Sequence, residues 1–214
     1  MCGVALMGNR FNPENIFTPE IYYQSSILDR NLNICDIATK SLKRSVKKRP
    51  IVTGLDMCCG WGIIGASLLL KDVITYCHFT DIIPNELEDC QANIDACGLE
   101  ERSKVYESDV WQNINGKFDF VIANPPWYQN RVEYFMDLEL REEAWLDLDW
   151  RWHKKFFHGL KEHLNYGGVC LLIEGSTASH VSVFEPMVEG LQFEAIQFEK
   201  QELKTSWIME IHNV

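Results

Sequence analysis

The sequence has no apolar run that approaches the roughly 18 to 20 residues needed to cross a bilayer, although hydrophobic residues make up 46% of its 214 positions. No basic residue precedes the apolar stretch between Met1 and Gly8, so the start of the chain lacks the pattern of a signal peptide. Internal repeats and low-complexity tracts are also absent. These absences argue against a membrane-spanning or repeat protein, and we expect a cytoplasmic protein with no membrane partner.

Metal-binding patterns are absent too. The eight cysteines include no C-x-x-C pair, and most of them lie inside apolar runs, so we expect buried, reduced thiols and no zinc. His153, His158 and His163 follow one another at five-residue spacing, which spreads them around a predicted helix. We therefore predict that these histidines lie at the surface and that the protein has no metal site.

Positive charge is scarce. The net charge of −11 repels a phosphate backbone unless basic residues gather on one face. Six basic residues do gather between Lys40 and Arg49, where they would either touch nucleic acid or coat a solvated helix end. Between Glu133 and Asp149 the chain has seven acidic residues and one basic residue, Arg141. This acidic segment disfavours nucleic acid and suits a small-molecule or peptide substrate, although it would also serve as a solvated lid.

The apolar pattern alternates short strands with longer amphipathic stretches, which is typical of an α/β sheet. Strands are predicted near residues 51–57, 74–80, 104–108, 118–124, 169–174, 193–199 and 206–212, and helices after Gly62, over 84–97 and over 150–164. The last two strands are too close for a helical crossover, so they should form an antiparallel hairpin. At this length we expect a single domain over 1–214, with an N-terminal helical segment or lid at 1–50 and the catalytic core at 51–214.

The tetrapeptide Asn124-Pro125-Pro126-Trp127 ends one of the predicted strands. Its prolines fix φ and donate no N–H, so they hold the Asn124 side chain and the Pro125 carbonyl rigid. Both oxygens can accept hydrogen bonds from a planar NH₂ group, while Trp127 and Tyr128 orient its plane. Because the lone pair of such a nitrogen is delocalised, these bonds favour the geometry in which it can attack an electrophile. The alternative to a reactive corner is a structural role, in which the prolines cap the strand and Trp127 is a buried residue.

Candidate ligand-binding residues follow the first three predicted strands. Gly60 and Gly62 allow a tight turn and a close approach of a ligand beside a helix N-terminus. Asp81 ends the second strand, where a carboxylate can accept both hydroxyls of a ribose. Asp109 follows the third strand and can accept the amine of an adenine. Alone, the glycines fit a dinucleotide loop or a plain strand-to-helix turn equally well, and each acid alone is better explained as a surface loop residue or a helix cap. Their order along the chain and their common sheet edge indicate a nucleoside site.

This order of motifs resembles the class I S-adenosylmethionine-dependent methyltransferases, from Ile51 to the end of the chain. The resemblance implies a Rossmann-like, seven-stranded sheet with its last strand antiparallel, and S-adenosylmethionine as cofactor. The Asn-Pro-Pro-aromatic corner narrows it to the amino-methyltransferases of adenine N6, guanine N2 or glutamine amides. The cofactor-binding residues that it implies are Asp56, Cys58, Gly60, Gly62, Asp81, Ile82, Asp109, Val110, Trp111, Asn124, Gln24 and Ser26, and the catalytic residues are Asn124, Pro125, Trp127 and Tyr128.

Within that group the layout is similar to the HemK-type glutamine methyltransferases. Residues 17–20 and 24–28 resemble the segment that closes over the cofactor in those enzymes, and 143–145 falls where their substrate loop lies. Cys58, however, replaces the first glycine of the loop, and 146–150 replaces a glycine-rich segment. We expect no counterpart of the helical domain with which bacterial members hold the release factor.

We therefore expect an N-methyltransferase that acts on a planar amide or amine nitrogen of a small molecule or peptide-like substrate. One alternative is an adenine-N6 methyltransferase of RNA or DNA, which would use the basic cluster between Lys40 and Arg49. Others are a protein glutamine methyltransferase and a catalytically silent subunit that binds the cofactor. The sequence predicts nothing about the oligomeric state.

Overall fold

The computed structural model describes residues 5–6, 9–10, 40, 52–131, 141–175, 178–188, 190–197 and 206–214. The chain divides into two compact units, residues 1–107 and 108–214. Gln24, Ser26 and the basic cluster beyond Lys40 lie outside the described residues, as does most of the predicted N-terminal segment. The predictions made for them stay predictions.

The first unit contains three parallel strands in the order β5-β4-β3. Its elements are β1 (Ala5–Leu6), β2 (Asn9–Arg10), β3 (Thr53–Met57), α2 (Ile63–Leu70), β4 (Tyr76–Asp81), α3 (Pro84–Ala96), the 3-10 helix η1 (Glu100–Arg102) and β5 (Ser103–Glu107). The register pairs Met57 with Thr80 and Asp81 with Glu107, so the three strands end at nearly the same level. The loops that follow β3 and β4 therefore share one edge of the sheet.

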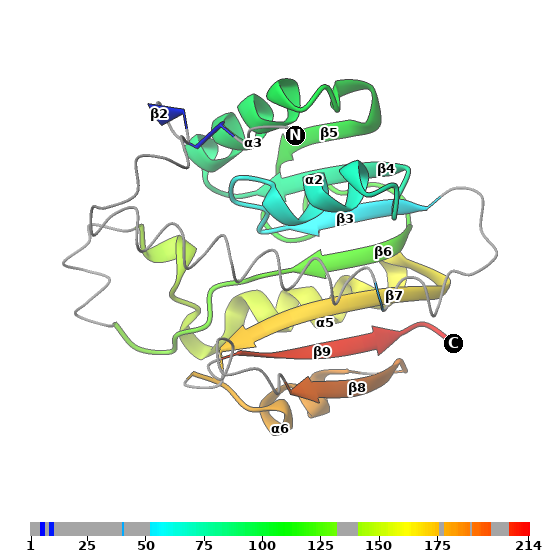
Figure 1. The fold of residues 1–214 in the computed structure, drawn as a ribbon. Helices are drawn as coiled ribbons and strands as arrows, with labels where there is room; N and C mark the ends of the chain where they lie inside the picture. The colour runs from blue at the N-terminus through cyan, green and yellow to red at the C-terminus, as the bar shows by residue number, and fades with distance from the viewer. Residues whose placement is uncertain are drawn as a thin grey trace. The chain divides into compact units, whose positions relative to one another are not determined.

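The second unit contains four strands side by side, in the order β6-β7-β9-β8 (Figure 1). Its elements are β6 (Phe118–Ala123), the 3-10 helices η2 (Glu142–Ala144) and η3 (Leu148–Trp150), α5 (Arg151–His163), β7 (Leu164–Gly175), α6 (Val181–Phe184), the 3-10 helix η4 (Glu185–Met187), β8 (Gln192–Gln197) and β9 (Ser206–His212). Strand β7 runs parallel to β6, whereas β9 is antiparallel to both β7 and β8.

The predicted fold class is confirmed. Three strands in the first unit and four in the second make up the seven strands of a class I methyltransferase sheet, and the last two form the expected antiparallel hairpin. The largest difference lies at β7, which begins at Leu164 rather than at residue 169. The chain passes directly from α5 into this strand, and an irregularity opposite Phe118 and Phe120 absorbs the extra residues.

The core of the second unit follows from its apolar pattern. All six residues of β6 are buried, and α5 buries Phe156, Phe157 and Leu160. Phe184 packs against Phe157 and Trp207. Burying a side chain of this kind contributes roughly 1.5–3 kcal/mol to folding. Within the described ranges, no helix is both long enough and apolar enough to span a membrane.

The cysteines agree only in part with the expectation. The thiols of Cys77, Cys90 and Cys170 are buried and form no disulfide, and burial raises the pKa of Cys170 well above its ordinary value. Cys97 differs, because it is disulfide-bonded. It follows the last turn of α3 and is only half-buried, so the packing argument did not apply to it.

Candidate active site

The glycine loop joins β3 to α2 in the first unit. Gly60 and Gly62 both have positive φ, 49° and 73°, as the predicted tight turn requires. A Cβ on Gly62 would lie 2.5 Å from the sulfur of Cys90, so packing demands glycine there. Among the described residues, a Cβ on Gly60 would meet the Glu86 carboxylate alone, at 3.6 Å. Gly60 therefore presents the open side of the loop.

Two buried acids hold this loop in shape. Asp56 accepts a hydrogen bond from the Gly65 N–H at 2.8 Å. Asp81 accepts three backbone N–H bonds, from Gly60 at 3.0 Å, Ile82 at 2.8 Å and Ile83 at 3.0 Å. A carboxylate offers about four lone-pair positions, so Asp81 keeps capacity for about one further donor. We predicted that Asp81 would accept hydrogen bonds from both hydroxyls of a ribose. The three backbone N–H groups already occupy most of its acceptor positions.

Glu86 was not anticipated from the sequence. It lies in the first turn of α3, beside the open side of Gly60, and burial together with the nearby Asp81 and Asp89 raises its pKa to about 7. Burial also raises the pKa of Asp56 to about 7 and that of Asp81 above its usual value. Because burial disfavours the charged forms of these acids, a cation beside them would favour their ionisation. The sequence offered one signal for Glu86, because this carboxylate lies five residues after Asp81, the acid that ends β4.

The loop after β5 carries the predicted adenine residues, in the second unit. Asp109 forms an ion pair with Lys155 at 2.5 Å. Val110 has a φ of 53°, which is strained for a β-branched residue, and the Ser108 hydroxyl donates to its carbonyl at 2.8 Å. Trp111 turns toward α5 instead. Its indole N–H donates to the Phe156 carbonyl at 2.9 Å, which leaves Val110 as the better candidate to cover a purine ring.

The Asn-Pro-Pro-Trp corner lies directly beyond β6. Pro125 and Pro126 are buried, and Asn124 is half-buried. The side-chain oxygen of Asn124 is buried and accepts no hydrogen bond within the described part of the chain. Buried polar atoms are almost always paired in folded proteins. An orphan acceptor at the end of a central strand is therefore consistent with an acceptor reserved for a ligand.

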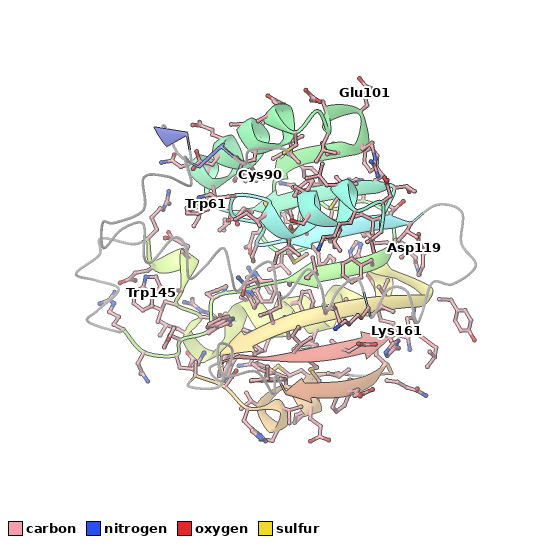
Figure 2. The ribbon with its side chains drawn as sticks, viewed as in Figure 1. Trp61, Cys90, Glu101, Asp119, Trp145 and Lys161 are labelled. Atoms are coloured by element: carbon pink, nitrogen blue, oxygen red, sulfur yellow. The ribbon has the colours of Figure 1, made fainter. Side chains whose placement is uncertain are left out.

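The two aromatic residues of the corner are anchored on different sides. The Trp127 indole N–H donates to the Ile173 carbonyl at 3.0 Å, and its ring lies where a Cβ on Gly175 would be, 2.6 Å from Trp127 Cε3. Tyr128 exchanges backbone hydrogen bonds with the following loop, donating to Trp145 at 2.9 Å and accepting from Asp147 at 2.8 Å. Trp145 lies beyond the carboxyl end of β6 (Figure 2).

A buried histidine lies beneath this loop, and our prediction of a surface position for it is wrong. His153 is fully buried, with Nδ1 2.6 Å from Asp147 and Nε2 2.7 Å from Glu174, and both carboxylates are buried as well. The Ser179 hydroxyl donates to the other oxygen of Glu174 at 2.9 Å. Helical spacing alone missed this residue, because both of its partners lie outside the helix.

The presence of Ser, His and acidic side chains raises the possibility of a nucleophilic hydrolase, which the geometry excludes. In such a triad the histidine must take a proton from the serine. Here both ring nitrogens of His153 contact carboxylates, and Ser179 contacts Glu174 instead. His153 therefore has no nitrogen left to serve as the general base for Ser179. In the described ranges no group of three potential ligands is arranged to hold a metal ion.

The structure thus groups the predicted site residues within each unit. In the first unit Asp56, Cys58, Gly60, Gly62 and Asp81 form the glycine loop and its support, with Ile82 exposed beside them. In the second unit Asp109, Val110 and Trp111 pack beside α5, while Asn124 to Tyr128 form the corner. Their union in one pocket stays a prediction.

Comparisons with known proteins bear on the family and the fold. The family model described as the methyltransferase small domain matches residues 32–192. Among curated proteins, the chain is 29% identical over 133 residues to ribosomal RNA small subunit methyltransferase C of Haemophilus influenzae, covering 62% of this chain and 35% of that protein. The protein of the same name from Shewanella oneidensis is 33% identical over 116 residues, covering 50% of this chain and 33% of that protein. The chain thus spans about a third of the length of these relatives.

Solved structures share the fold. An rRNA methylase from Streptococcus thermophilus has a TM-score of 0.60 at 11% identity, covering 84% of this chain and 96% of that chain. A ribosomal protein L11 methylase from Lactobacillus delbrueckii subsp. bulgaricus has a TM-score of 0.56 at 15% identity, covering 82% and 76%.

The curated relatives contradict our expectation that nucleic acid is disfavoured, because they are named for ribosomal RNA. The structure supplies a physical reason for the error. The described acids of the segment are largely paired: Glu142 with Arg131 at 2.8 Å, Glu143 with Arg141 at 3.7 Å, and the buried Asp147 with His153. A count of acidic residues along the sequence therefore overstates the negative charge that a partner would meet.

Proposed function

Because the chain belongs to the methyltransferase small domain family, we propose that it is an S-adenosylmethionine-dependent N-methyltransferase whose acceptor is an exocyclic amine of a base in RNA. The names of the curated relatives support the RNA substrate. The buried, unpartnered Asn124 oxygen is the observation that carries the choice of a nitrogen acceptor. The narrower similarity to HemK-type glutamine methyltransferases stays a prediction.

The residues present fit the cofactor. When bound, S-adenosylmethionine supplies a methyl group on a positively charged sulfur. The open side of Gly60 gives its backbone room, and Asp81 retains capacity for one ribose hydroxyl. The carboxylates of Asp56, Asp81 and Glu86 favour a positively charged ligand at this edge. Val110 is the residue that we assign to the purine face.

The corner prepares the acceptor nitrogen. We assign the two N–H groups of the base amine to the Asn124 side-chain oxygen and the Pro125 carbonyl. These acceptors draw the nitrogen out of conjugation with the ring, so its lone pair becomes available as the new bond forms. The nitrogen then carries a positive charge and loses a proton to solvent. No strong base is needed, because the alignment of nitrogen and methyl group supplies most of the rate enhancement.

Helix α5 offers the positive charge that an RNA backbone requires. Its exposed positions include Arg151, Lys154, Lys155, His158 and Lys161. Their spacing of three to four residues places them along one side of the helix. The helix runs from the loop beside the corner toward the opposite end of β6, where Lys161 lies (Figure 2). Phosphate contacts along it would bring an RNA strand to the corner despite the net charge of −11.

The activity is tested with an unmodified transcript of small-subunit ribosomal RNA, S-adenosylmethionine and mass spectrometry of the digested nucleosides. We expect a methylated base with the wild type. Asn124→Ala should lower the rate roughly a hundredfold or more, whereas Asn115→Ala, in the exposed loop before β6, should leave it unchanged. Methylation of a glutamine peptide or a small amine, with none of RNA, would overturn the proposal.

The RNA surface is tested by the salt dependence of binding. Lys154→Gln should reduce the slope of log affinity against log salt by about 1, the value expected for one lost phosphate contact. Lys71→Gln, at the exposed end of α2 in the first unit, is the matched control and should leave the slope unchanged. Equal slopes for wild type and Lys154→Gln would remove α5 from the RNA surface.

A further inference from the structure

We propose that His153 is a positioning residue for the reactive corner, because it links the anchors of Trp127 and Tyr128 through two buried carboxylates. The effect on catalysis rests on the proposed methyl transfer. The structural part does not, since it concerns how the corner is held.

The first link runs from Tyr128 to the histidine. Asp147 donates its backbone N–H to the Tyr128 carbonyl at 2.8 Å, and its side chain contacts Nδ1 of His153 at 2.6 Å. The same carboxylate accepts the backbone N–H of Trp152 at 2.7 Å. The backbone of Tyr128 is therefore held two hydrogen bonds away from the imidazole.

The second link runs from Trp127 to the other ring nitrogen. Nε2 of His153 contacts Glu174 at 2.7 Å. Glu174 lies in β7 between Ile173, whose carbonyl accepts the Trp127 indole N–H, and Gly175, against which the indole packs. The two links close a ring of contacts that includes both aromatic residues of the corner.

Strain in the backbone supports a tightly held ring. Asp149 and Trp150 are consecutive non-glycine residues with positive φ, 56° and 54°. Each such residue costs of order 1 kcal/mol or more and persists only where its surroundings determine it. Both lie in the segment between Asp147 and His153, and the hydrogen bonds that join Asp147 to Trp152 and His153 fix the two ends of this segment. Residues 146–150 replace the glycine-rich segment of the HemK-type enzymes, and Asp149 and Trp150 reach positive φ without glycine.

Charge explains why a histidine occupies this position. Two buried carboxylates without a cation between them would repel each other. A protonated imidazole donates one N–H to each, and the rings of Trp150, Trp152 and Phe184 pack around it. Burial alone would lower the pKa of His153, but Glu174 and Asp147 raise it above its ordinary value. A neutral amide in its place lacks the charge that balances the two acids.

The test compares His153→Gln with His158→Gln, which changes an exposed histidine on the same helix. Hydrogen exchange should become at least roughly tenfold faster at the amides of Tyr128 and Asp147 in His153→Gln, while the amides of β4 keep their rates. With RNA and cofactor, kcat should fall roughly tenfold to a hundredfold because the corner is misplaced. The KM for S-adenosylmethionine should stay within about twofold. His158→Gln should match the wild type in hydrogen exchange. Because His158 lies on the proposed RNA surface, the control for kcat is Asn115→Ala, which should leave kcat unchanged.

Each outcome decides the inference. Unchanged exchange at Tyr128 and Asp147 overturns it, and so does a faster exchange spread equally over β4, which indicates a general loss of stability. If His153→Gln does not fold, Glu174→Gln is used, because it keeps the shape of the partner and removes one charge; the same exchange pattern is expected. Because exchange needs no substrate, a wild type that methylates no RNA overturns the proposed function and leaves the positioning role to be decided by exchange alone.

Discussion

Cys58 occupies the first position of the glycine loop with a φ of 54°. A residue with a Cβ costs roughly 1–2 kcal/mol in this left-handed region, whereas glycine adopts it freely. In the glycine loop of the class I methyltransferases that this sequence resembles, this position is usually glycine. The structure supplies the physical meaning of the difference, which is backbone strain in the loop.

We predict that Cys58→Gly stabilises the protein by about 0.5–1 kcal/mol, since relief of the strain exceeds the entropy that glycine gains in the unfolded chain. Urea unfolding measures the change. Cys58→Ala keeps the Cβ and should bring no gain, so it is the control. Equal stability of the glycine and alanine variants would show that strain at φ is not the cause.

For individual residues, the sequence correctly predicted positions at or just after the end of a strand. Asp81, Asp109 and Asn124 follow apolar runs and lie where the strand pattern places them. His153 and Glu86 were missed, because their environment is created by residues distant in sequence or by a helix turn against a loop. Periodicity describes the face of an element, and says little about what another element brings to that face.

Helix α5 shows how one residue in a loop can begin an element. Asp147 accepts the backbone N–H groups of Trp152 and His153, which are among the first in the helix, and it pairs with the His153 ring. The same carboxylate therefore caps the helix and balances a buried charge. Its loss should affect the helix and the buried cluster together.

We predict that Asp147→Asn lowers the free energy of unfolding by about 2–4 kcal/mol, because it removes one partner of a buried ion pair. Asp149→Asn, two residues later, is the control, since Asp149 is exposed and asparagine tolerates its positive φ. Its effect should stay within about 0.5 kcal/mol. Denaturant unfolding followed by circular dichroism measures both. Equal effects would contradict the role given to Asp147.

Elements were more predictable than their boundaries. Every predicted strand and helix of the core is present, because each combines an apolar run with turn residues such as Gly98 and Pro84. The start of β7 was misjudged because Gly167 and Gly168 indicated a turn before the strand, whereas they lie within it. Lone glycines mark a special backbone position without fixing which kind it is.

The protein as a whole gathers buried acids with raised pKa values, which determines how its stability depends on pH. Burial raises the pKa of Asp56 to about 7, and burial with Asp81 and Asp89 raises that of Glu86 to about 7. Burial also raises the pKa of Glu174, even with His153 beside it. Between the unfolded and folded pKa values of such an acid, the folded state binds the extra proton. Stability therefore falls as the pH rises through this window.

We predict that the ligand-free protein is more stable at pH 5.5 than at pH 7.5. Asp56 contributes up to about 1.4 kcal/mol per pH unit below pH 7, and the partly exposed Glu86 contributes less. His153 acts in the same direction, because its contribution is present below its unfolded pKa and is lost as the pH rises through its raised folded pKa. Urea unfolding at several pH values measures the slope. Asp56→Asn should flatten it, and a slope of opposite sign would contradict the prediction.

The same acids couple protonation to cofactor binding under the proposed function. A positively charged ligand beside Asp56, Asp81 and Glu86 favours their ionised forms, so binding must release protons. Affinity for S-adenosylmethionine should therefore rise roughly threefold to tenfold from pH 6 to pH 7. S-adenosylhomocysteine lacks the charged sulfur and should show a smaller rise.

Calorimetry in buffers of different ionisation enthalpy counts the released protons directly. Glu86→Gln should reduce that count while α3 stays folded, and an unchanged count would exclude Glu86 from the cofactor's surroundings.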